Sequence, residues 1–132
     1  PTLWVHLAPL SVIPLSMLAL LKTTGDASLL RYGSLVAAAF LGAALWWLVL
    51  AVSMTIRNRR QGKLPFALSW WAFVFPIGAC SVLAYRVSEL LALEVLPLVA
   101  SGLTLLALFV WSATALGTVR GIRTGAIFAP AH

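Results

Sequence analysis

The chain alternates between long apolar stretches and short polar segments. Four stretches contain no Asp, Glu, Lys or Arg, and they run over Leu3–Leu21, Ser34–Ile56, Phe66–Tyr85 and Val95–Val119. A helix of about 20 apolar residues crosses a hydrocarbon core of about 30 Å, and a segment surrounded by lipid must satisfy its own backbone hydrogen bonds. The pattern predicts an all-α polytopic membrane protein. Its single transmembrane domain, residues 1–132, would hold four spanning helices as two helical hairpins.

Composition supports this class. Hydrophobic residues make up 62% of the 132 residues and charged residues only 9%. A soluble domain carries about 25% charged residues, and a small fold leaves much of its surface exposed. Soluble, disordered and fibrous classes are therefore excluded. The lone cysteine, Cys80, excludes an internal disulfide framework. Pro1 leads into an apolar run with no initiator Met and no basic segment, so we expect a piece of a longer protein rather than an ordinary signal peptide.

The charged residues predict the orientation. A net charge of +6 suggests nucleic acid in a soluble protein, but these charges lie between apolar stretches, so we expect no nucleic-acid partner. One side of the predicted membrane holds six basic residues and no acid: Arg57, Arg59, Arg60, Lys63, Arg120 and Arg123. The other side holds three basic and three acidic residues: Lys22, Arg31, Arg86, Asp26, Glu89 and Glu94. The positive-inside rule then predicts an integral protein of the cell or inner membrane with both termini in the cytoplasm.

Proline positions distinguish odd spans from even ones. Pro9 and Pro14 lie in the first span and Pro76 lies in the middle of the third, whereas the second has no proline and the fourth has one only near its start. A proline inside a helix removes a backbone hydrogen bond and kinks the helix. Proline is also simply common in membrane helices. The alternation nevertheless predicts two hairpins, each with a kinked and a straight helix, and a faint repeat aligns Trp4 and Pro9 with Trp71 and Pro76.

The spans offer little chemistry for an enzyme. His6 is the only histidine in a span, and no serine has a visible base beside it. We therefore expect no enzymatic activity, no cofactor and no metal. No span contains an acid, which argues against proton coupling through an intramembrane carboxylate and favours a path for anions. A basic mouth of Arg57, Arg59, Arg60 and Lys63 would raise the local anion concentration, although topology alone also accounts for these residues.

The third span contains the densest motif. It reads Ser69-Trp70-Trp71-Ala72-Phe73-Val74-Phe75-Pro76-Ile77-Gly78, with four aromatic residues ahead of a proline and a glycine. An aromatic ring beside a kink can close a narrow apolar passage, but the same residues can also serve only to pack a helix bundle. Phe73 and Phe75 lie about 200° apart around a helix, so at most one of them faces a pore squarely.

This motif resembles the WWAFxFPxG signature of the tellurite-resistance/dicarboxylate transporter family, which includes TehA and the plant slow anion channels. The opening Pro1-Thr2-Leu3-Trp4 with Ala8-Pro9 resembles the start of the seventh helix of that family. The resemblance covers essentially the whole chain but only the last four of the family's ten helices. It implies five helical hairpins around a quasi-fivefold axis, with the kinked spans of this chain on the inside.

The resemblance also implies a function. The gating phenylalanine of the family falls on Phe75, with Phe73 as the fallback. The partners would be the bilayer, the remaining helices of the same fold, a possible homo-trimer and small anions: C4-dicarboxylates, sulfite, tellurite-related anions or inorganic anions. Two alternatives stay open, namely a four-helix membrane scaffold without transport and a membrane redox enzyme, which would need paired histidines or a quinone.

Overall fold

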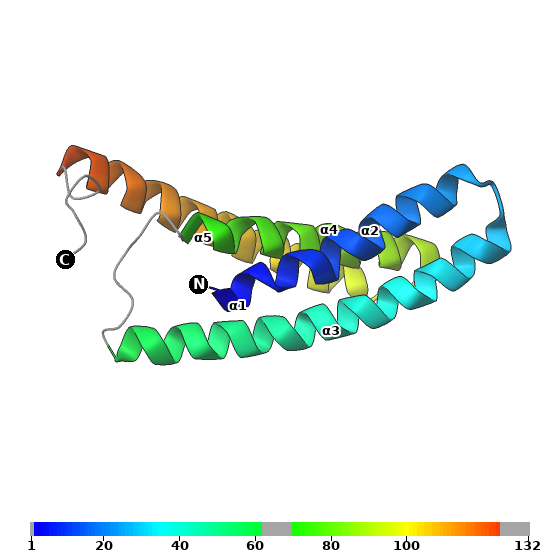
Figure 1. Cartoon of the computed structure of the whole chain (residues 1–132), viewed down its shortest axis with the longest axis horizontal. Helices are drawn as coiled ribbons and strands as arrows, with labels where there is room; N and C mark the ends of the chain where they lie inside the picture. The colour runs from blue at the N-terminus through cyan, green and yellow to red at the C-terminus, as the bar shows by residue number, and fades with distance from the viewer. Residues whose placement is uncertain (1, 62–69, 125–132) are drawn as a thin grey trace.

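The computed structural model describes residues 2–61 and 70–124, and every regular element within these ranges is helical (Figure 1). The helices are α1 (Thr2–Val5), α2 (Leu7–Thr23), α3 (Ala27–Arg60), α4 (Trp71–Leu91) and α5 (Leu96–Arg123). Three of them, α3, α4 and α5, are long and apolar enough to cross a membrane, and α2 is a shorter apolar helix of 17 residues. The prediction of an all-α polytopic membrane protein is confirmed.

The helices lie side by side along one long axis and alternate in direction (Figure 1). The start of α1, the end of α3, the start of α4 and the end of α5 share one end of the bundle, and the α2–α3 and α4–α5 turns share the other. α2 and α4 contact each other, α3 packs against both, and α5 packs against α4. This arrangement consists of two hairpins joined through α2 and α4.

Small residues allow α3 to approach the rest of the bundle closely. Ala37, Ala44 and Ala51 are spaced seven residues apart and are buried, with Leu41 and Leu48 between them. Positions seven residues apart lie on one helix face, and small residues at membrane helix interfaces let backbones come near each other. The opposite face of α3 is exposed over large side chains such as Trp46 and Val49, as expected for a surface that meets lipid.

Both turns have specific backbone chemistry. Gly25 takes φ +71°, which glycine adopts without a steric penalty. Asp26 then caps α3, because its carboxylate accepts hydrogen bonds from the backbone N–H groups of Ser28 (2.9 Å) and Leu29 (3.1 Å). At the α4–α5 turn, Ala92 takes the left-handed conformation that often ends a helix. The Ser88 hydroxyl donates to the Leu93 carbonyl across this turn.

The two hairpins repeat one interhelical hydrogen bond. The Trp4 indole N–H donates to the Thr55 hydroxyl at 2.9 Å, joining α1 to α3. The Trp71 indole N–H donates to the Thr118 hydroxyl at 3.2 Å, joining α4 to α5. Each threonine in turn donates to the carbonyl four residues earlier. The repeat that aligns Trp4 with Trp71 in the sequence thus has a matching pair of contacts in the structure.

The helix bounds differ from the apolar stretches. The first predicted span is two helices interrupted at His6. α3 begins seven residues before Ser34, α4 continues six residues beyond Tyr85, and α5 continues four residues beyond Val119, while residues 66–69 lie outside the described residues. Arg31, Arg86, Glu89 and Arg120 therefore lie on helices rather than in loops. A helix keeps its backbone hydrogen bonds after it leaves the hydrocarbon, so the loss of hydrophobicity does not end it.

Candidate functional site

The first half of α4 places its two phenylalanines in opposite surroundings. Phe73 is 4% exposed, and its ring centroid lies 5.0 Å from that of Trp4 and 5.8 Å from that of Trp70. Phe75 is 64% exposed. Two residues on a helix differ by about 200° in direction, so burial of one side chain turns the other outward. Phe75 thus lies on the exposed face of α4, whereas Phe73 takes part in packing α1 against α4.

The three prolines predicted to kink helices, Pro9, Pro14 and Pro76, lie on α2 and α4, which pack against each other. Pro14 lies within α2 and Pro76 within α4, and both are buried. Pro76 has no N–H to donate to the Ala72 carbonyl, one turn before it and next to Trp71. Pro9 occupies the third position of α2, where no intrahelical N–H bond is needed, and the break between α1 and α2 falls three residues earlier, at His6.

One face of α4 continues from Phe75 toward the opposite end of the bundle. Ala79, Val82 and Arg86 follow at helical spacings of four, seven and eleven residues, so they share the direction of Phe75 to within about 40°. Val82 and Arg86 are exposed. The three acids of the chain are at positions 26, 89 and 94, so this face is free of carboxylates from Phe75 up to Arg86.

The predicted basic mouth lies at the end of the bundle that holds the start of α4. Arg57, Arg59 and Arg60 are exposed on the last turn of α3, while Lys63 lies outside the described residues. Arg120 and Arg123 in the last turn of α5 are at the same end (Figure 1). Positive side chains in the last turn of a helix also complement its dipole.

The other end contains a cavity that the sequence did not predict. It measures about 470 Å³ and lies between α2, α3 and α4, where it is lined by Leu15, Leu18, Ala19, Lys22, Leu30, Arg86, Glu89 and Leu90. Arg86 and Glu89 form an ion pair at 3.1 Å within α4. The helical spacing of Arg86 from Phe75 could have suggested that Arg86 belongs to the same face.

The described residues bring together no cluster of potential metal ligands. No group of three or more His, Cys, Asp or Glu side chains gathers within residues 2–61 and 70–124. His6 lies against the ring of Trp47, with centroids 5.8 Å apart, and Cys80 is buried as a free thiol.

Comparison with known proteins extends this geometry. Residues 1–119 match the family described as voltage-dependent anion channel. Two relatives from Methanocaldococcus jannaschii are similar over 128 residues: "Uncharacterized transporter MJ0576" at 29% identity and "Uncharacterized transporter MJ0762" at 28%. Each alignment covers 97% of this chain and 37% of the relative, so the chain spans little more than a third of the length of these relatives. No solved structure matches.

Proposed function

This chain belongs to the voltage-dependent anion channel family, and we propose that its helices α2 and α4 form part of the wall of an anion-conducting passage across a membrane. The observation that carries the proposal is the exposed face of α4, which presents Phe75 and has no carboxylate between Phe75 and Arg86. Anions avoid buried carboxylates, and a passage without them presents no fixed negative charge to repel the ion. Because the relatives are longer than this chain, helices beyond these residues would complete the passage.

The proposed gate is the ring of Phe75. An exposed aromatic ring on an apolar wall narrows a passage and expels water from it, and an anion cannot cross a dry apolar constriction. Pro76 leaves the Ala72 carbonyl without its helical donor, so the first turn of α4 is held by one bond fewer and yields more readily. Phe73 stays as the fallback gate, but its packing between Trp4 and Trp70 gives it little room to move.

The proposed orientation puts the arginine-rich end of the bundle in the cytoplasm. Arg57, Arg59, Arg60, Arg120 and Arg123 lie there with no acid, whereas Asp26, Glu89 and Glu94 lie at the other end. This asymmetry is what the positive-inside rule describes. With Lys63 between the second and third spans, these cations would raise the anion concentration at the cytoplasmic mouth.

The proposed substrate class is a small anion: a C4-dicarboxylate, sulfite, a tellurite-related anion or an inorganic anion. The test is flux of malate, sulfite, chloride and nitrate into liposomes that carry the complete gene product. Flux of at least one anion, absent from empty liposomes, supports the proposal. A well-folded protein that passes none of these anions would instead favour a membrane scaffold.

The gate is tested with three matched substitutions. Phe75→Ala should raise basal anion flux severalfold, whereas Phe73→Ala should chiefly lower stability. Phe109→Ala, at a 72% exposed position on α5, is the control for loss of an exposed ring. A rise in basal anion flux with Phe73→Ala alone would assign the gate to Phe73. No rise in flux with either variant would refute an aromatic gate.

A further inference from the structure

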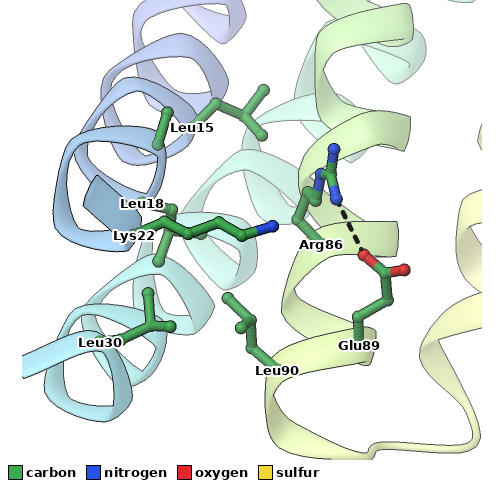
Figure 2. Close-up of a pocket in the computed structure, with 8 residues that line it drawn as sticks. Leu15, Leu18, Lys22, Leu30, Arg86, Glu89 and Leu90 are labelled. Atoms are coloured by element: carbon green, nitrogen blue, oxygen red, sulfur yellow. Dashed lines mark hydrogen bonds and ion pairs between the residues drawn. The ribbon is translucent and has the colours of Figure 1, made fainter. Parts of the chain in front are cut away.

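The cavity at the end of the bundle opposite the arginine-rich end combines charged and apolar groups. Figure 2 shows Lys22 extending from α2 across the cavity toward α4, where Arg86 and Glu89 form an ion pair. Four leucines from α2, α3 and α4 supply the apolar wall: Leu15, Leu18, Leu30 and Leu90. The cavity therefore has cations from two helices above a surface that offers no hydrogen bonds.

The charges in this cavity do not cancel. Glu89 pairs with one guanidinium nitrogen of Arg86 at 3.1 Å, and Lys22 has no carboxylate within ion-pair distance among the described residues. Two cations and one anion leave a single positive charge. Arg86 and Glu89 are about half exposed, at 55% and 46%, so their pair is readily rearranged by a competing anion.

Arg86 also connects this cavity to the face of α4 that carries Phe75. Eleven residues turn a helix through about three full turns, so the two side chains point within about 20° of each other and lie about 16 Å apart along the axis. An ion that moves along this face would leave the ring of Phe75 and meet Arg86 next. This step rests on the proposed function.

We propose that the cavity is a binding site for a singly charged, weakly hydrated anion, held by Lys22 and Arg86 at the end of the passage away from the arginine-rich mouth. The single net positive charge matches one negative charge. The guanidinium offers a planar fork of N–H donors that fits an oxyanion such as nitrate, and the lysine adds a point charge. The leucine wall disfavours strongly hydrated ions, because it cannot replace their water shell.

Glu89 gives the site a signature that simple surface charge lacks. Its carboxylate occupies part of the Arg86 donor set and repels an incoming anion. Removing this carboxylate should strengthen anion binding, whereas removing either cation should weaken it. A purely structural role for the ion pair predicts instead that Arg86→Gln and Glu89→Gln have similar effects.

The probe is nitrate, titrated into the complete gene product in phosphatidylcholine nanodiscs and followed by calorimetry. We expect Lys22→Gln and Arg86→Gln each to weaken nitrate binding by roughly tenfold, as for loss of one charge-assisted hydrogen bond. Glu89→Gln should tighten binding about twofold to fivefold. The matched control is Arg31→Gln, which removes an exposed cation at the same end of the bundle but outside this cavity.

These outcomes distinguish a specific anion site from a diffuse surface potential and from a bound lipid headgroup. Unchanged affinity in both Lys22→Gln and Arg86→Gln overturns the site, as does an Arg31→Gln effect as large as that of Arg86→Gln, which would show a diffuse surface potential. The same anion chemistry is also present in a lipid headgroup. If phosphatidylglycerol nanodiscs abolish nitrate binding in the wild type but not in Lys22→Gln, a headgroup occupies the cavity and the assignment to a dissolved anion is wrong.

Calorimetry measures binding without transport, so the two proposals fail separately. Nitrate binding with the expected pattern of variants but no anion flux would refute the conducting passage and leave the site standing. If anion flux depends on Phe75 but nitrate affinity is unchanged by the substitutions at Lys22, Arg86 and Glu89, the site is refuted and the conducting passage still stands.

Discussion

The repeated tryptophan–threonine contact gives a quantitative test of how the hairpins are held. We consider Trp71→Phe, Thr118→Val and the double variant, and the same set for Trp4 and Thr55. Phenylalanine keeps an aromatic ring without the indole N–H, and valine keeps the shape of threonine without the hydroxyl. The double-mutant cycle then isolates the hydrogen bond from the loss of packing.

The structure predicts unequal coupling in the two hairpins. Interhelical hydrogen bonds in membrane proteins average about 0.6 kcal/mol and reach about 1.7 kcal/mol. The Trp71–Thr118 bond is 3.2 Å long and exposed, so we expect about 0.5 kcal/mol. The Trp4–Thr55 bond is 2.9 Å long and partly buried, so we expect about 1 kcal/mol, or roughly a fivefold change in the unfolding equilibrium.

The measurement is reversible unfolding of the complete gene product in mixtures of dodecyl maltoside and SDS. Trp111→Phe is the control, because Trp111 is exposed on α5 and makes no hydrogen bond among the described residues. Zero coupling in both cycles, or a larger coupling for Trp71–Thr118 than for Trp4–Thr55, would refute the reasoning. Trp71 lies one helical turn before Phe75, so Trp71→Phe should also raise basal anion flux if this bond steadies the gate.

Two further predictions concern the α2–α3 hairpin. Asp26→Ala should lower the free energy of unfolding by about 1 kcal/mol, because the two N–H groups at the start of α3 lose their acceptor. Asp26→Asn should keep most of this stability, because its side-chain oxygen can still accept these hydrogen bonds. Equal losses for the two variants in thermal unfolding would disprove the capping role. Gly33→Ala should change the free energy of unfolding by less than about 1 kcal/mol, because the added methyl meets only the terminal methyl of the Leu21 side chain, which can rotate away, whereas Gly42→Ala enters open space in the same helix and should be neutral or slightly stabilising; a loss of more than about 2 kcal/mol for Gly33→Ala in thermal unfolding would show that Leu21 cannot move aside.

The helical class followed from the sequence because the bilayer imposes a length. Each apolar stretch had to cross about 30 Å of hydrocarbon, and only a helix can do so alone. The ends were predicted less well, since hydrophobicity marks the limits of the hydrocarbon and not of the helix. α3 begins at Ala27 because Asp26 caps it there, and the polar residues that follow continue the helix outside the core.

The position of the break in the first span also could not be predicted from the sequence. Pro9 predicted a distortion, and the structure places the break at His6. Proline removes its own N–H and crowds the carbonyl four residues earlier, so its effect falls on the preceding turn. Which residue of that turn leaves the helix depends on packing, here the burial of Trp4 and Leu7 on either side of an exposed His6.

The candidate site was only half visible in the sequence. Helical spacing predicted that Phe73 and Phe75 point in opposite directions, but the contact of Phe73 with Trp4, 69 residues away in the chain, decides which one is buried. The cavity of Lys22 and Arg86 was missed for the same reason, because it exists only where α2 and α4 lie side by side. The resemblance to the family is confirmed by the match over residues 1–119.

The unbroken length of α3 has a consequence for how this protein meets different membranes. Its 34 residues form a rod about 51 Å long with no proline, well beyond the thickness of a hydrocarbon core. The 25 residues between Arg31 and Arg57 carry no charge and extend about 38 Å along the helix axis, and an apolar stretch longer than the hydrocarbon core of about 30 Å is accommodated by tilt. Lipids with longer acyl chains would let α3 stand more upright, and through its contacts with α2 and α4 such hydrophobic mismatch would change the tilt of the whole hairpin pair.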